Sequence, residues 1–142
     1  MERRISRGRF IRLGAAAGIG AVAVGSAACR SSDGGEEVAR GQAIVEKADL
    51  APGSALAFTD AATGKPGLLV HLKNGAFVGY SAECTHQGCT VSYRAKGEGS
   101  LACPCHGSVF DPVSGGEVVS GPAREPLPQL SIEVREGRIF RA

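Results

Sequence analysis

Two short segments pair cysteine with histidine, and they limit what the chain can fold into more than any other feature. Residues 84–89 read Cys-Thr-His-Gln-Gly-Cys, and residues 103–108 read Cys-Pro-Cys-His-Gly-Ser. Glycine in each segment allows positive φ and lets the backbone approach a bound group closely. Thiolates and imidazoles from two such loops can bind either a zinc ion or an iron–sulfur cluster. Both interpretations require a fold that brings the two loops together.

The spacing within the first segment favours the cluster. Structural zinc sites usually place two or more residues between paired ligands, whereas only Thr85 separates Cys84 from His86. Such close neighbours are awkward ligands for one tetrahedral ion, but they can reach two different iron atoms. A structural zinc knuckle is the alternative interpretation.

The pattern C-x-H-x-G-C followed by C-P-C-H-G-S closely resembles the Rieske iron–sulfur family, specifically the branch found in quinol–cytochrome c reductases. The resemblance implies one [2Fe–2S] cluster, with Cys84 and Cys103 on the inner iron and His86 and His106 on the outer, more exposed iron. Imidazoles in place of two thiolates make a cluster less negative, which raises its reduction potential to between about −150 and +300 mV. Outer histidines that lose a proton on oxidation would couple electron uptake to proton uptake, which suits a quinol donor.

The resemblance also assigns the remaining cysteines. It implies a disulfide between Cys89 and Cys105 that ties the two loops together, and such a bridge requires an oxidising compartment. The chain has five cysteines. Two are then ligands, two form the bridge, and Cys29 stands alone near the N-terminus.

Residues around the ligands are expected to tune the site. Ser108 matches the family position whose hydroxyl donates a hydrogen bond to a bridging sulfide, and Gly121-Pro122-Ala123 resembles the proline loop that covers the cluster. Phe110 stands where high-potential members have a tyrosine, so we expect a potential in the middle of the range. Gln87 stands where quinol-oxidising members usually have leucine, which weakens the inference to a quinol pocket.

The N-terminal segment predicts export. Residues 2–12 contain five arginines and one glutamate, and residues 13–28 carry no charge. This is the pattern of a secretory signal, and its arginine-rich start resembles a twin-arginine signal. Residues 26–29, Ser-Ala-Ala-Cys, resemble a lipobox in which Cys29 would be lipidated. Residues 1–29 are therefore expected to be a signal peptide or membrane anchor, with the domain at the outer face of the cytoplasmic membrane. A freely secreted protein is the alternative.

The rest of the chain predicts a tether followed by one all-β domain of small antiparallel sheets. Residues 30–42 are polar and glycine-rich, as in a flexible tether. Residues 43–142 form the expected Rieske-type domain, which includes a cluster-binding subdomain. Asn74-Gly75 and Glu136-Gly137 are two-residue hairpin signals. The predicted strands are 43–47, 55–59, 67–72, 76–81, 90–93, 99–102, 108–110, 117–119, 130–135 and 138–141.

Charge excludes one function class. Removing residues 1–29 takes away five of the 16 basic and one of the 14 acidic residues, which leaves 11 basic and 13 acidic residues. A net charge of −2 is unsuited to nucleic-acid binding, which needs a basic stripe. The remaining histidine, His71, lies in an apolar run and is expected to be a strand residue facing solvent or a core edge, not a ligand.

These features predict an electron-transfer subunit without catalysis of its own. The first hypothesis is transfer from a quinol or another membrane-side donor to a cytochrome c, in a complex with a cytochrome b. The second is the small Rieske subunit of an exported molybdenum oxidoreductase such as arsenite oxidase. The third is a Rieske ferredoxin, a class that generally lacks the bridge cysteines Cys89 and Cys105 and an export signal.

Overall fold

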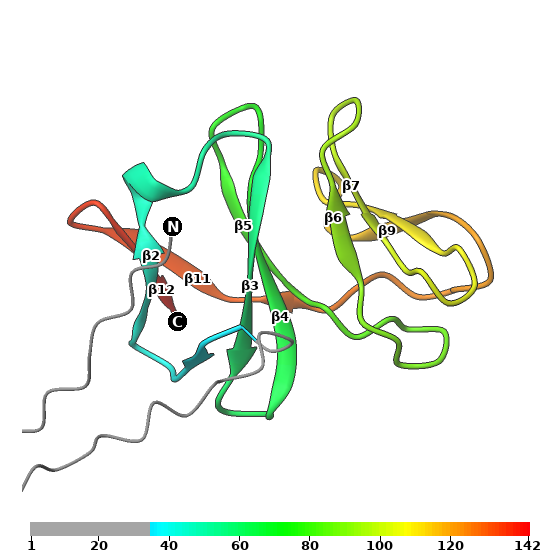
Figure 1. Cartoon of the computed structure of the whole chain (residues 1–142), viewed down its shortest axis with the longest axis horizontal. Helices are drawn as coiled ribbons and strands as arrows, with labels where there is room; N and C mark the ends of the chain where they lie inside the picture. The colour runs from blue at the N-terminus through cyan, green and yellow to red at the C-terminus, as the bar shows by residue number, and fades with distance from the viewer. Residues whose placement is uncertain (1–34) are drawn as a thin grey trace, which may run out of the picture. The chain divides into compact units, whose positions relative to one another are not determined.

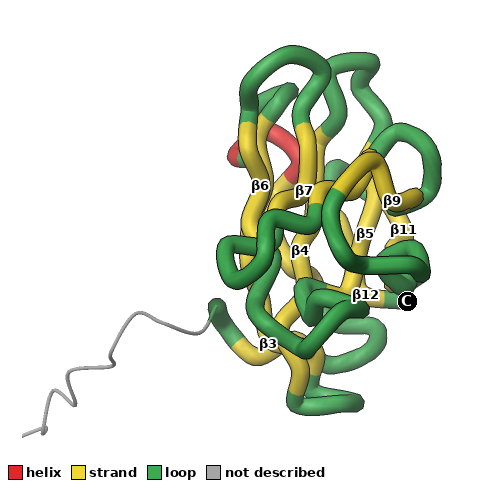
Figure 2. The backbone as a smooth tube through the Cα atoms, turned by 90° about the vertical axis from the view of Figure 1, so that its right-hand side faces the viewer, coloured by secondary structure: helices red, strands yellow, loops and turns green. Residues whose placement is uncertain are grey.

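The computed structural model describes residues 35–142, and within them regular structure is almost entirely β-strand. The one helical segment in this part is the 3-10 turn η1 (Lys47–Asp49), coloured red in Figure 2. The strands form three sheets of five, three and four strands. The predicted all-β fold is therefore confirmed. The strands are β1 (Glu37–Val38), β2 (Ala43–Glu46), β3 (Ser54–Asp60), β4 (Lys65–His71), β5 (Phe77–Ser81), β6 (Ser92–Arg94), β7 (Ser100–Ala102), β8 (Val109–Asp111), β9 (Glu117–Ser120), β10 (Gln129–Leu130), β11 (Ile132–Arg135) and β12 (Arg138–Arg141).

Strand β4 lies at the centre of the five-stranded sheet, whose order is β1-β3-β4-β5-β10. Successive side chains of a strand point to opposite faces of its sheet. Leu68 and Val70 accordingly belong to one hydrophobic core, and Leu69 belongs to another. Because both faces of β4 are covered, the strand reads as a continuous apolar run rather than as an alternation.

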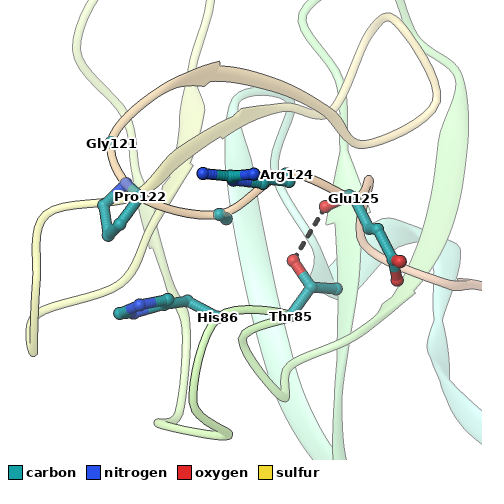
Figure 3. A pocket seen from close by; sticks show the side chains of 7 residues that line it. Thr85, His86, Gly121, Pro122, Arg124 and Glu125 are labelled. Atoms are coloured by element: carbon teal, nitrogen blue, oxygen red, sulfur yellow. Dashed lines mark hydrogen bonds between the residues drawn. The ribbon is translucent and has the colours of Figure 1, made fainter.

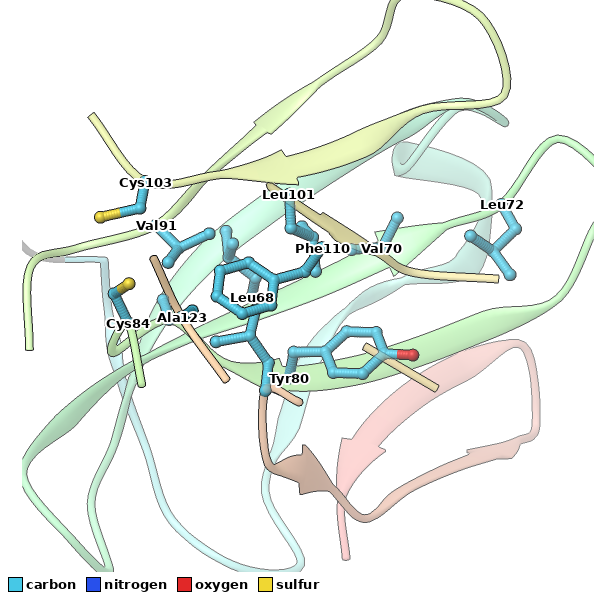
Figure 4. Packing of buried hydrophobic residues seen from close by; sticks show 12 residues of the cluster. Leu68, Val70, Leu72, Tyr80, Cys84, Val91, Leu101, Cys103, Phe110 and Ala123 are labelled. Atoms are coloured by element: carbon cyan, nitrogen blue, oxygen red, sulfur yellow. The ribbon is translucent and has the colours of Figure 1, made fainter. Parts of the chain in front are cut away.

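The first core lies between the five-stranded sheet and the four-stranded sheet, whose order is β6-β7-β8-β9. The latter sheet is drawn in yellow-green to orange on the right of Figure 1. Leu101 of β7 and Phe110 of β8 are cross-strand partners, and both are fully buried. Figure 4 shows them packed with Leu68, while Cys84 and Cys103 lie together at one end of the same core.

The second core lies toward the three-stranded sheet, whose order is β11-β12-β2. A buried ion pair joins this sheet to β3: Arg141 Nη2 lies 3.2 Å from Asp60 Oδ2, and both side chains are at least 95% buried. Burial by itself raises the pKa of Asp60. The hydrogen bonds from Arg141 and from the Ala62 amide, together with the Arg141 charge, outweigh burial and hold that pKa below its usual value.

The structure corrects the predicted tether. Glu37–Val38, inside residues 30–42, form β1 and pair in parallel with Thr59 and Asp60 of β3. The Val38 side chain is only 2% exposed and belongs to the second core. The described end of this segment is therefore part of the folded domain.

Both predicted hairpins form, but only one of them has the predicted two-residue loop. Glu136 and Gly137 both have positive φ, and they join the paired residues Arg135 and Arg138 as expected for a two-residue turn. The Asn74-Gly75 turn is longer than predicted, because the last ladder pair before it is His71 with Phe77. In addition, Ser131 interrupts the strand predicted over 130–135, so that β10 and β11 belong to different sheets.

No helix among the described residues is long and apolar enough to span a membrane. The predicted signal or anchor, residues 1–29 with Cys29, lies outside the described part of the chain.

Candidate metal centre

The two cysteine–histidine segments form matching turns. In the first, the Cys84 amide donates to the Cys89 carbonyl (2.9 Å) and the Gly88 amide donates to the Cys84 carbonyl (2.8 Å). The second repeats both bonds at the same spacing from Cys103, with distances of 2.8 and 3.2 Å. Gly88 and Gly107 both have a φ of +76°, which glycine adopts without steric cost. The glycines therefore close the two loops in the same way.

Cys84 and Cys103 supply two buried thiols. Each is 3% exposed, and they are the free cysteines of the described residues. Cys84 lies shortly after β5, and Cys103 directly follows β7. Because both belong to the first core, ligand sulfurs at these positions are shielded from water.

His86 and His106 face the outside of the same site. Their ring centroids lie 4.9 Å apart, and the rings are nearly perpendicular at 89°. His86 is half-buried and His106 is exposed. The arrangement thus matches the predicted order, with cysteines inside and histidines outside.

The predicted disulfide is present. Cys89 and Cys105 are bonded to each other across a sequence separation of 16 residues, which ties the two loops together. The sulfur of Cys103 lies within 4.8 Å of both bridge sulfurs. Since the bridge sulfurs are already bonded, Cys103 is the member of this group that can bind a metal.

A third loop, residues 121–125, packs on the second ligand loop. Ser108 is fully buried, and its Oγ accepts a hydrogen bond from the Ala123 amide at 3.1 Å. Gly121 has a φ of +94°, and a Cβ at this position would lie 2.5 Å from the Ser108 Cα. Only glycine fits so close an approach. Gly121 and Pro122 therefore lie beside the site, as the resemblance implied.

Phe110 and Gln87, the residues expected to moderate the potential, lie in the core and at the surface, respectively. Phe110 is fully buried in the core that holds both free thiols, and it carries no hydroxyl. Tyr80 in the same core donates its hydroxyl to the Pro112 carbonyl at 2.9 Å. Burial and the Asp111 charge raise the pKa of Tyr80, so this hydroxyl stays protonated. Gln87 is exposed beside His86.

His71 has a structural role away from this site. It is 7% exposed, its Nδ1 lies 2.6 Å from the Leu50 carbonyl, and its ring stacks on Phe77 at 3.9 Å. Nδ1 therefore donates to Leu50, and the residue fixes the end of β4.

This donor set fits a [2Fe–2S] cluster. It offers two buried thiols and two facing imidazoles, which is the ligand chemistry of a Rieske centre. The Ser108 hydroxyl accepts one hydrogen bond, and among the described residues its own hydrogen has no acceptor. A buried hydroxyl hydrogen without a protein partner suits a bound group that accepts it.

Comparison with known proteins decides the family. A family model described as the Rieske [2Fe–2S] domain matches residues 41–131. The chain belongs to this family. A provisionally named Rieske subunit of respiratory nitrate reductase from Haloferax mediterranei is 50% identical over 58 residues, which are 41% of this chain and 26% of that protein. The Rieske iron–sulfur subunit of the cytochrome bc1 complex from Streptomyces lividans is 46% identical over 59 residues, covering 42% and 35%.

A solved structure agrees with this assignment. The plasma membrane Rieske protein PetC3 from Synechocystis PCC 6803 has a TM-score of 0.53 and 30% identity, covering 61% of this chain and 83% of that one. As a Rieske domain, the protein binds a [2Fe–2S] cluster and transfers electrons. The chain spans about a third or less of the length of the two curated relatives.

The sequence did not reveal one feature beside His86. A surface pocket of about 590 Å³ lies between the first ligand loop and the third loop (Figure 3). Thr85 Oγ1 donates to the Glu125 carbonyl at 2.7 Å, and both residues line the pocket. Arg124 also lines it. No local pattern signals a contact between residues 40 positions apart, so only the fold could reveal it.

Proposed function

We propose that this Rieske protein transfers single electrons at the outer face of the cytoplasmic membrane, as a subunit of a respiratory chain similar to the quinol–cytochrome c reductases. Cys84, Cys103, His86 and His106 would hold the cluster. The observation that carries the proposal is the joining of two ligand loops by one disulfide, with buried thiols inside and accessible imidazoles outside.

The residues around the site have different proposed roles. When bound, the cluster supplies a one-electron couple in the range of about −150 to +300 mV. Cys84 and Cys103 would hold it at the buried end of the first core, and Phe110 makes that core apolar. His86 and His106 are the proposed ligands nearest to solvent, so a redox partner would dock at their edge of the domain.

A second candidate function is the Rieske subunit of an exported molybdenum oxidoreductase, of the kind that arsenite oxidase represents. The exposed Gln87 favours it, because an apolar residue would suit a quinol pocket better at this position. The similarity to a protein named as a nitrate reductase Rieske subunit also favours a redox-enzyme partner.

Two features support the proposed location. The Cys89–Cys105 bridge suits an oxidising compartment, and residues 1–29 carry the predicted signal and Cys29. A lipid on Cys29, or an uncleaved anchor, would hold the domain at the membrane. Fractionation of cells that produce the Cys29→Ala variant distinguishes these two, since release of the domain from membranes would support the lipid and retention would support the anchor.

Electron paramagnetic resonance of the reduced full-length protein tests the cluster. A rhombic signal with average g below the free-electron value is expected, and His106→Ala should abolish it. His71→Gln is the matched control, because it removes a histidine outside the site and should leave the signal intact. An unchanged signal in His106→Ala would refute the ligand assignment.

The partner requires a separate measurement. The tagged protein is purified with its native complex from membranes, and the complex is analysed for haem and for molybdenum. Haem b without molybdenum supports the reductase-like complex, whereas molybdenum supports the second candidate.

A further inference from the structure

Arg124 is an unpaired cation beside His86. Among the seven residues that line the pocket of Figure 3, it is the only lysine or arginine. Its guanidinium extends over the pocket toward Pro122, whereas the Glu125 carboxylate points away from it. Within residues 35–142 no ion pair or side-chain hydrogen bond engages Arg124, although several other arginines of that part are ion-paired. Its charge is therefore available to a ligand from outside.

The backbone on both sides of Arg124 is fixed to the ligand loops. The Ala123 amide donates to Ser108 Oγ in the second loop, at 3.1 Å. The Glu125 carbonyl accepts from Thr85 Oγ1 in the first loop, at 2.7 Å. Because each neighbour is tied to a different loop, the position of Arg124 relative to both loops is set by the fold. A cation held in this way loses less entropy on binding than one on a free loop.

The charge of Arg124 contrasts with that of the domain. Residues 35–142 contain 10 basic and 12 acidic residues, a net charge of −2. Glu125 is the nearest acidic residue in sequence, and its carboxylate points away from Arg124. An anion that approaches the histidine edge therefore meets a local positive site on a slightly negative protein. Guanidinium forms strong paired hydrogen bonds to carboxylates.

We infer that Arg124 is the docking contact for a carboxylate on the acidic surface of a water-soluble electron-transfer protein, which it holds beside His86. The inference rests on the proposed electron-transfer function and specifies the partner. An acidic surface on the electron acceptor compensates the charge of Arg124.

Two redox reagents of opposite charge test the inference on the full-length protein with its cluster. The reduced protein gives one electron to hexacyanoferrate(III), a trianion, or to tris(phenanthroline)cobalt(III), a trication, in stopped-flow experiments. Arg124→Gln should slow oxidation by the anion roughly three- to tenfold at low salt, because local charges steer association. In 1 M salt, where the Debye length is about 3 Å, the difference should vanish. Oxidation by the cation should not slow.

The control is Arg40→Gln, which removes the same charge from an exposed residue before β2. It should change the anion rate by less than twofold at the same low ionic strength, a rough bound for a charge remote from the site. Arg124→Lys should retain much of the rate. An equal slowing in Arg124→Gln and Arg40→Gln would overturn the inference, since it would show an effect of net charge only.

A second readout does not depend on electron transfer. Binding of redox-inert hexacyanocobaltate(III), followed by calorimetry, should weaken in Arg124→Gln and not in Arg40→Gln. If a cluster signal is present but both anion readouts are unchanged, the docking inference fails and the proposed function stands. If the wild-type protein shows no cluster signal, both fail. Slower reduction of Arg124→Gln by a short-chain quinol, with the anion readouts unchanged, would assign the pocket to quinol and also overturn the inference.

Discussion

Replacing Ser108 by alanine removes two interactions that can be measured separately. The Ser108 side chain is fully buried, and its Oγ accepts the hydrogen bond from the Ala123 amide. Alanine leaves that amide without a partner in a place where water has little access, since Ala123 is 5% exposed. The same substitution removes the hydroxyl hydrogen that is free to donate to the cluster.

The two losses have different magnitudes and different observables. A buried donor without a partner costs about 1–3 kcal/mol of folding free energy. A hydrogen bond to an ionised acceptor is stronger than one to a neutral acceptor, so the reduced cluster should lose about 1–2 kcal/mol more than the oxidised one. At about 59 mV per 1.4 kcal/mol for one electron, the reduction potential of Ser108→Ala should fall by roughly 40–85 mV.

Redox titration of the visible spectrum measures the potential, and guanidinium denaturation measures the stability. Gly121→Ala is the control, because its Cβ would crowd the Ser108 Cα and disturb the third loop while the hydroxyl remains. It should lower stability with a smaller change in potential. A potential for Ser108→Ala within about 15 mV of wild type, or an equal fall in Gly121→Ala, would refute the assigned donor role, because 15 mV corresponds to only about 0.4 kcal/mol.

Three further predictions follow from the structure. Phe110→Tyr should raise the reduction potential, because its added hydroxyl can donate beside the buried thiols; a titration without an upward shift contradicts this. Cys89→Ser should lower the free energy of unfolding by about 3 kcal/mol, which is the loop-closure value for a bridge spanning 16 residues. Equal stability of the wild-type protein with and without reductant would count against this prediction. The pKa of Asp60 is lower in the folded than in the unfolded protein, so its contribution is present above the unfolded pKa and is lost as pH falls through the folded pKa. Denaturation at a series of acidic pH values should therefore show a shallower loss of stability in Asp60→Asn than in wild type, and parallel curves would disprove the claim.

The ligand loops could be predicted because their chemistry is local. Two segments of six residues contain the thiols, the imidazoles and the glycines that close the turns, and the spacing inside each reflects the turn that it forms. The all-β fold could also be predicted from the sequence. Hairpin signals such as Glu136-Gly137 act within a few residues, and this turn forms with both φ angles positive.

Features that depend on distant contacts could not be predicted. Strand β1 has two residues, and it is held by pairing with β3 and by burial of Val38, neither of which produces a periodic pattern. The Asp60–Arg141 ion pair joins residues 81 positions apart. The Thr85–Glu125 hydrogen bond similarly joins the first ligand loop to the third loop. In each case the sequence contains the two partners but no signal that pairs them.

The third loop explains how such a small domain can hold its site rigidly. One ligand loop is bonded to the other through Cys89–Cys105, and the third loop is bonded to both, through Ser108 and through Thr85. These three links connect the three loops in a closed ring, so that a displacement of one loop relative to the others strains at least one link. A site supported in this way is preorganised for the group that it binds. The same ring also sets the position of Arg124, so recognition of a partner and positioning of the ligands depend on one set of bonds.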